Sequence, residues 1–167
     1  MRVLALDYGS ARCGCALSDP SGTLATPIDV VERPGSRRGL ARLEALVRER
    51  EVGRVVVGLP LGLSGADTPQ TAEARAFAAR LGERLGAGVP VDLYDERFTT
   101  RIAARSGGAG AAGEDSRAAA VLLEDWLVRH GHEAADAPAR GADRGQPEAG
   151  ALDDDRRSGD DREAGGA

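Results

Sequence analysis

Apolar residues are concentrated in three short runs at the start of the chain. The runs cover residues 2–6, 13–18 and 23–31, and turn residues separate them. Strands joined by short turns pair as an antiparallel meander, which we expect here. Pro27 lies inside the third run and has no backbone N–H to donate, so it predicts either an edge strand or a bulge.

Beyond residue 35 the pattern predicts helices that alternate with single strands. Apolar side chains three and four residues apart predict an amphipathic helix that ends near Glu51. Thr68 followed by Pro69 predicts the N-cap and the first residue of a second helix. The β-branched run at 55–59 is typical of a parallel strand that is covered on both faces. The predicted elements are helices at 36–51 and 69–85, strands at 55–59 and 89–94, a short helix at 98–105, a flexible loop at 106–113, and a last helix from Asp115 to His130 that Gly131 closes.

This order of elements predicts an α/β fold with a five-stranded mixed sheet and helices on both faces. Strands one, four and five are expected to be parallel and central. We expect one domain at 1–131. Residues 132–167 are expected to form a disordered acidic tail, because they carry too few apolar side chains to bury.

Charge is distributed unevenly along the chain. The net charge is −5, all 22 basic residues are Arg, and there is no Lys. Residues up to Glu133 hold 17 Arg against 18 acidic residues, whereas Ala134 onward holds 5 against 9. The body is thus nearly neutral, which permits a nucleic-acid partner without demanding one.

The two cysteines and the N-terminus favour a cytoplasmic protein. Cys13 and Cys15 are poorly spaced for a disulfide and are expected to be buried, reduced thiols. Only four apolar residues precede Asp7, too few for a signal peptide, and no apolar run approaches membrane-spanning length.

Acidic residues end two of the predicted parallel strands. Asp7 ends the first, and Asp95 and Glu96 end the fifth. Asp115 shares a helical face with the apolar positions of the last helix, so its side chain is expected to point inward. Glu124 and Asp125 lie on other faces of this helix and are expected to be solvated charges. Because sites in parallel sheets lie at the carboxyl ends of the strands, three carboxylates are predicted to meet at one edge.

Each carboxylate alone also has a simple structural explanation. Asp7 could be a turn residue after a strand. Asp95 or Glu96 could begin a helix, where acidic side chains are favoured, and Asp115 could be an N-cap. The coincidence of all three at one edge favours a site.

Carboxylates that meet at one edge repel one another unless a cation joins them, and Mg²⁺ or Mn²⁺ prefers such oxygen ligands. The predicted ligands are Asp7, Glu96 and Asp115. A pair of such ions activates water and stabilises the leaving oxygen in phosphodiester cleavage. The predicted contacts to the neighbouring phosphate are the glycine turn at Gly9, Arg12, Arg97, Thr99 and Thr100.

Four motifs in this order resemble the YqgF family of Holliday-junction-resolvase-like proteins, also described as pre-16S rRNA nucleases. The resemblance covers residues 1 to 131. It rests on Asp7-Tyr8-Gly9 with Arg12 and Gly14, Gly58-Leu59-Pro60-Leu61 with Gly65, Asp95-Glu96-Arg97 with Thr99-Thr100, and Asp115-Ser116 with Ala118-Ala119 and Leu122-Leu123.

The resemblance implies a ribonuclease H-like fold and a metal-dependent endonuclease that trims the 5′ end of small-subunit rRNA precursor within ribosomal precursor particles. Branched DNA is the alternative substrate. By matching position, Asp7, Glu96 and Asp115 are the implied catalytic acids. The family usually carries a longer, basic loop before the helical aspartate, whereas residues 107–114 contain no basic residue here.

Two rivals from other classes remain. The first is an ATPase of the actin-like superfamily, which also begins with an Asp-x-Gly turn, but 131 ordered residues cannot hold the two domains that it needs. The second is a ribosome-assembly factor that binds RNA without cutting it, which the depleted loop favours. Cleavage of precursor rRNA separates these possibilities.

Overall fold

A computed structural model describes residues 1–62, 64–95 and 111–136. Its described elements are β1 (Arg2–Tyr8), β2 (Arg12–Ser18), β3 (Ala25–Glu32), α1 (Arg37–Glu49), β4 (Val52–Leu59), α2 (Pro69–Leu85), the short 3-10 helix η1 (Gly86–Gly88), β5 (Val91–Asp95) and α4 (Ala111–Asp136). The short helix predicted at 98–105 lies outside the described residues, as does the predicted tail from residue 137 onward.

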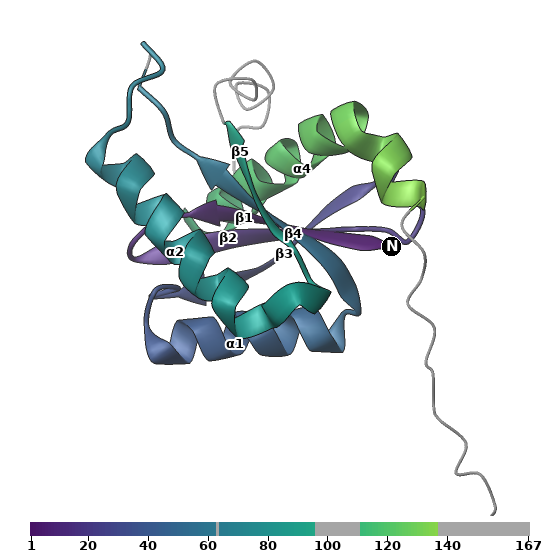
Figure 1. Ribbon diagram of the computed structural model, residues 1–167, viewed down its shortest axis with the longest axis horizontal. Coiled ribbons are helices and arrows are strands. Elements are labelled where there is room, and N and C mark those ends of the chain that lie inside the picture. The colour runs from purple at the N-terminus through teal and green to yellow at the C-terminus, as the bar shows by residue number, and fades with distance from the viewer. Residues whose placement is uncertain (63, 96–110, 137–167) are drawn as a thin grey trace, which may run out of the picture.

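The strands form one five-stranded mixed sheet in the order β3-β2-β1-β4-β5 (Figure 1). β1, β2 and β3 pair antiparallel, and β1, β4 and β5 pair parallel, as the sequence predicts. β3 is an edge strand, and the register shifts close to Pro27. Both readings of that proline are therefore confirmed, whereas β5, predicted to be central, is the other edge.

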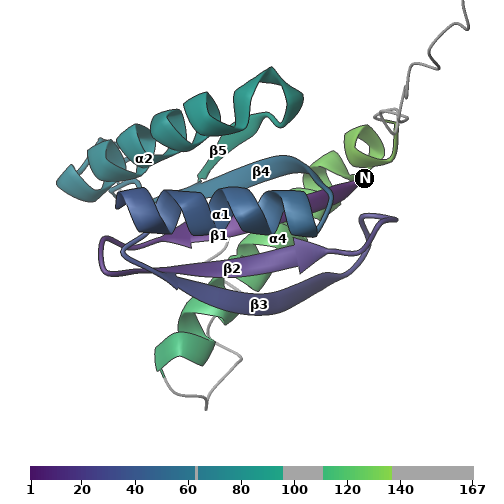
Figure 2. The ribbon, with the colours of Figure 1, turned by 90° about the horizontal axis from the view of Figure 1, so that it is seen from below.

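Helices cover both faces of the sheet (Figures 1 and 2). On one face, Leu4 and Leu6 of β1 pack into a core with α1 and α2. On the other face, Val3 and Ala5 pack into a second core beneath α4. The alternation along β1 thus fixes which side chains can reach which helix.

The helix starts follow the local sequence. The Ser36 side chain accepts a hydrogen bond from the Gly39 N–H at the start of α1. Thr68 and Thr71 form a reciprocal capping box ahead of α2, so the predicted Thr68 cap is confirmed. None of the helices in the described ranges is long and apolar enough to cross a membrane.

The predicted limits of the last helix are wrong at both ends. α4 begins at Ala111, so residues 111–113 are helical rather than part of a loop, and Asp115 lies too far into the helix to be its N-cap. The helix also continues past Gly131 to Asp136, so residues 132–136 are helical and not part of a tail. A glycine inside a helix costs only about 1 kcal/mol relative to alanine, which neighbouring helix formers can offset.

β1 also extends further than predicted, through Asp7 to Tyr8. Asp7 pairs with Gly14, and Tyr8 pairs with Cys13. The Tyr8 ring stacks on Phe77 of α2, with ring centroids 4.5 Å apart, which holds the last residue of the strand in place. Asp7 is therefore inside the strand and not in the following turn.

The backbone of α4 lies directly against the sheet at Gly14. A Cβ atom at this position would lie 1.9 Å from the backbone oxygen of Asp115 and 2.8 Å from the backbone nitrogen of Ser116. The Ser116 hydroxyl donates a hydrogen bond to the Ile28 carbonyl of β3 at 3.1 Å. The absence of a side chain at Gly14 lets the backbone of α4 rest directly on β2.

Tyr94 ties β5 to α4 through a carboxylate that the sequence reading placed in solvent. The Tyr94 hydroxyl donates a short hydrogen bond to Oδ2 of Asp125, which also accepts from Nε of Arg129 at 3.1 Å. The Asp125 side chain is only 15% exposed, so its prediction as a solvated charge is wrong, whereas Glu124 is exposed as expected. Burial and the hydrogen bond to Asp125 raise the pKa of Tyr94 above its ordinary value.

Replacing Gly14 by Ala should destabilise the protein by more than about 2 kcal/mol, because backbone atoms of α4 cannot move aside as a side chain can. Gly53→Ala is the matched control in β4, since its Cβ would meet only the flexible Met1 side chain. Urea unfolding measures both. Equal losses in the two variants would contradict the close approach.

The raised pKa of Tyr94 predicts a stability that falls in alkali. The unfolded chain releases the tyrosine proton near pH 10, before the folded protein does, so the contribution is complete below pH 10 and declines above it. Between pH 9 and 11 the wild type should lose about 1 kcal/mol more than Tyr94→Phe. Urea midpoints measured across this range test the idea, and parallel curves for the two proteins would contradict it.

Candidate active site

Asp7 lies at the carboxyl end of the central parallel strand, on the face that α4 covers. Val3 and Ala5 of the same strand belong to the core beneath α4, and alternation places Asp7 on that side. The residue is half-buried, and its cross-strand partner is Gly14. The carboxylate thus lies where the sheet ends and where α4 begins to cross it.

Asp115 reaches the same place from α4. Its backbone oxygen lies against Gly14, the partner of Asp7, so both aspartates flank one glycine. The hydrogen bond with Cys15 and burial raise the pKa of Cys13 well above its usual value. The negative charges of both aspartates also contribute to the raised pKa of the Cys13 thiol. The structure therefore brings two of the three predicted acids together.

Arg12 faces Asp115 across this site. Its Nε lies 3.2 Å from Oδ2 of Asp115, and both side chains are about one-third exposed. The contact lacks the angle of a hydrogen bond, and Oδ2 is buried without a hydrogen-bond donor in the part of the chain that the structure describes. A partly exposed pair of this kind contributes at most about 1 kcal/mol. Arg12 therefore balances the Asp115 charge without satisfying its oxygen.

Arg117 was missed by the sequence reading. Its Nη1 is buried and, like Oδ2 of Asp115, has no hydrogen-bond partner within the described ranges. A basic residue two positions after an aspartate in a helix carries no sequence signal of its own. The first turns of α4 thus hold two unsatisfied buried atoms, one anionic and one cationic.

Gly9 shapes the turn that presents Arg12. Its N–H donates to the Arg12 carbonyl at 2.9 Å, and a Cβ atom at Gly9 would lie 2.8 Å from that oxygen. A larger residue would open the turn. Gly9 therefore fixes the start of β2, and with it the position from which Arg12 reaches Asp115.

Of the polar residues that the sequence analysis places at the end of β5, only Asp95 is among the described residues. Asp95 is the last residue of the strand, and Leu59 of β4 pairs with it. Leu93, two residues earlier, lines a hollow beside α2, so alternation places Asp95 on the face opposite Asp7. The remaining predicted site residues lie outside the described residues; these are Glu96, Arg97, Thr99 and Thr100.

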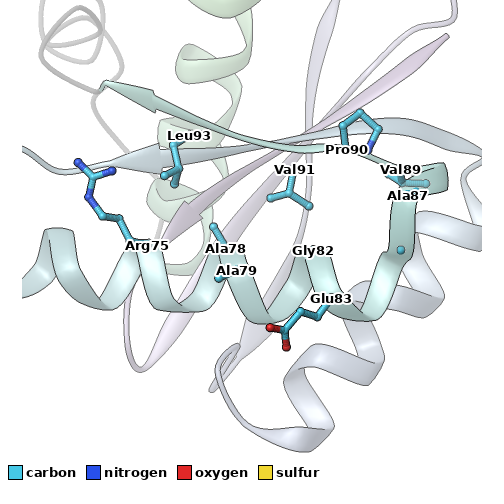
Figure 3. Close-up of a pocket in the computed structure, with 11 residues that line it drawn as sticks. Arg75, Ala78, Ala79, Gly82, Glu83, Ala87, Val89, Pro90, Val91 and Leu93 are labelled. Carbon is cyan, nitrogen blue, oxygen red and sulfur yellow. The ribbon is translucent and has the colours of Figure 1, made fainter.

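A hollow of about 530 Å³ lies between α2 and β5 (Figure 3). Ala78 and Val91 in its lining pack with the core beneath α1 and α2, so the hollow is on the opposite face of the sheet from Asp7. Its lining is mostly apolar, with Arg75 and Glu83 as the charged residues. Arg75 is paired with Asp67 at 3.3 Å. Neither Asp7 nor Asp115 lines this hollow, so the carboxylate pair and not this hollow is the candidate site.

Comparisons with known proteins identify a matching family and relatives that are named as nucleases. A family model for RuvX, described as a Holliday junction resolvase, matches residues 1–129. A protein of Anaeromyxobacter sp. (strain Fw109-5) is 43% identical over 134 residues, which cover 76% of this chain and 96% of that protein. A protein of Thermobifida fusca is 45% identical over 139 residues, which cover 74% and 85%. Both bear the name "Putative pre-16S rRNA nuclease".

A solved structure shares the fold. The T. thermophilus RuvC in complex with Holliday junction substrate superimposes with a TM-score of 0.51 at 17% identity, over 78% of this chain and 96% of that one. The likeness confirms the predicted ribonuclease H-like class and bears on the fold alone. With the family match over residues 1–129, it follows that the chain belongs to the RuvX family, the one that the motifs predicted under the name YqgF.

Proposed function

We propose that this protein is a divalent-metal-dependent endonuclease that cleaves structured RNA, with the 5′ region of pre-16S rRNA as its substrate. One observation carries the proposal: Asp115 of α4 rests against Gly14, the cross-strand partner of Asp7. Two carboxylates from distant parts of the chain thus converge where parallel strands end, the usual place for a site in such a sheet.

The donor set fits a hard divalent cation. Oδ2 of Asp115 is buried without a hydrogen-bond donor among the described residues, and a metal ion would satisfy it. No group of three or more His, Cys, Asp or Glu side chains within the described ranges could hold a metal. The proposal therefore includes Glu96, which follows Asp95 in the sequence and is the third acid of the family motifs.

The proposed site residues have two roles, metal binding and phosphate binding. Asp7, Glu96 and Asp115 would hold Mg²⁺ or Mn²⁺, which supplies an activated water and charge stabilisation at the leaving oxygen. Arg12 neutralises Asp115 at 3.2 Å in the free protein. Its guanidinium can turn to a phosphate oxygen, where two parallel N–H donors bind most strongly. Arg97, Thr99 and Thr100 are the proposed further phosphate contacts.

We propose RNA rather than branched DNA as the substrate because of the names that the most similar proteins described above bear. Proteins 43% and 45% identical to this chain are named for pre-16S rRNA, and they match along most of their length. The family description names Holliday junctions instead. Cleavage of the RNA precursor and of a four-way DNA junction, measured side by side, decides between the two substrates.

Asp7→Asn should lower the cleavage rate on precursor rRNA with Mn²⁺ at least about 100-fold, because it removes a charge that holds the ion. The fold should persist in EDTA, because asparagine has nearly the size and shape of aspartate. Asp29→Asn is the control, because Asp29 is an exposed aspartate of β3 paired with Arg42. Undiminished cleavage by Asp7→Asn would refute the scheme, and binding without cleavage by the wild type would favour a non-catalytic assembly factor.

Metal binding should be visible without any substrate. Saturating Mn²⁺ at about 100 times its dissociation constant should stabilise the wild type by about 2.7 kcal/mol. Asp115→Asn should lose most of this stabilisation, whereas Asp29→Asn should retain it. Thermal unfolding with and without Mn²⁺ measures the difference, and an equal response of all three proteins would place the metal elsewhere.

A further inference from the structure

We propose that four arginines around the start of α1 form a second contact surface for the phosphate backbone of the nucleic-acid substrate. These residues, here called the α1 arginine surface, are Arg33, Arg37, Arg38 and Arg80. The inference rests on the proposed nuclease function and extends the binding surface beyond the carboxylate site. The ligand chemistry is the phosphodiester backbone common to RNA and DNA.

The α1 arginine surface lies at the same end of the sheet as the carboxylates. The Arg33 N–H donates to the Ala11 carbonyl at 2.8 Å, which joins the approach to α1 to the turn between β1 and β2. Figure 2 shows the first turn of α1 beside that turn. Arg12 follows Ala11 directly, so the surface begins one residue away from the arginine that faces Asp115.

Arg80 of α2 joins this surface at Tyr8. A Cβ atom at Gly35 would lie 3.6 Å from the Tyr8 hydroxyl and 3.9 Å from Nη1 of Arg80. Burial and Glu73 raise the pKa of Tyr8, and the Arg80 charge opposes them, which agrees with a guanidinium close to the ring hydroxyl. Because Tyr8 follows Asp7, the surface and the carboxylates occupy opposite faces of one strand end.

The positive charges at this place form no ion pair within the described part of the chain, and Glu73 is the acidic residue that acts on Tyr8 beside them. Residues 33–43 hold four arginines and no acidic residue, and the first turn of α1 has no acidic side chain. All four arginines of the surface are exposed and form no ion pair with any described residue. Three further exposed arginines of the same two helices are paired, Arg42 with Asp29, Arg75 with Asp67, and Arg84 with Glu44, whereas Arg48 in the last turn of α1 has no ion pair among the described residues.

The local backbone makes this charge costly. Arg37 and Arg38 are the first residues of α1, where the helix dipole favours negative side chains and disfavours positive ones. Arg33 has a φ of 44°, in the left-handed region that suits glycine. Three arginines thus occupy positions where another residue would favour the fold, and an anionic ligand would relieve the unfavourable charge.

Guanidinium groups at such positions suit phosphate oxygens. Each presents a planar fork of N–H donors that pairs with phosphate, and contacts of this kind position a nucleic acid without reading its sequence. A strand whose scissile phosphate lies at Asp7 and Asp115 can continue over the edge of the sheet onto the α1 arginine surface. This supplies positive charge that the segment before Asp115 lacks.

The test compares two double variants of the same helix. Arg37→Gln/Arg38→Gln changes the surface. Arg48→Gln/Arg50→Gln removes the same charge at the opposite end of α1, from two exposed arginines that have no ion pair with a described residue. Fluorescence anisotropy in EDTA measures binding of a labelled RNA hairpin and of a labelled four-way DNA junction. EDTA separates binding from cleavage.

The surface variant should bind about tenfold more weakly at 0.1 M salt, and its slope of log K against log salt should fall by about 1 to 2, one for each lost phosphate contact. The control variant should stay within about twofold of the wild type. If the hairpin alone shows the difference, the surface serves RNA; if the junction alone shows it, the surface serves DNA. Equal weakening of the two variants would overturn the proposal, because diffuse charge would explain it.

Arg33→Gly separates binding from stability. The substitution relieves the left-handed strain, so the melting temperature should be unchanged or higher while affinity falls about threefold. A wild type that cleaves precursor rRNA, together with surface variants that bind like the control, overturns only this inference. A wild type that neither binds nor cleaves either probe overturns the proposed function as well.

Discussion

The contact between α4 and Gly14 is the constraint on which the site depends. A helix usually rests on a sheet through side chains, but here its backbone meets the strand, since a Cβ at Gly14 would collide with the Asp115 carbonyl. Because Gly14 is the cross-strand partner of Asp7, this approach also determines how near the two carboxylates lie. One missing side chain therefore controls both the docking of α4 and the assembly of the acidic pair.

At the carboxyl end of the parallel strands, the charge of Asp115 is balanced by Arg12, a partner that can be replaced by another cation. Arg12 stands 3.2 Å from Asp115 but leaves its buried oxygen without a hydrogen bond, so the pair neutralises charge without satisfying the acceptor. The structural pair at Tyr94 behaves differently, because Asp125 there accepts from both a hydroxyl and Arg129. A carboxylate that accepts two hydrogen bonds stabilises the fold, whereas one whose buried oxygen accepts none among the described residues can take the cation proposed for this site.

Most of the fold was predictable because hydrophobic period and turn chemistry are local signals. The meander, the parallel strands and the cap at Thr68 follow from a few neighbouring residues each. The limits of α4 were not predictable in this way, since glycines at both ends indicated stops that the helix runs through. Asp125 was misjudged for another reason: its burial depends on Tyr94, which is distant in sequence. The convergence of Asp7 and Asp115 was inferred from strand ends and helical phase, but the role of Gly14 requires the packed structure.

The arginines show how a nearly neutral body can still present a charged side. Where an arginine of α1 or α2 lies beside a carboxylate, the fold gains a modest surface pair, as with Arg84 and Glu44 at 2.6 Å. At the start of α1 the same residue type has no carboxylate partner among the described residues and occupies positions that the helix dipole disfavours. For stability alone, an acidic residue would be favoured in the first turn of α1, and a glycine would be favoured at position 33. The sign of the net charge is therefore a poor guide to whether the protein binds nucleic acid. Charged residues at positions where they destabilise the fold are a better guide.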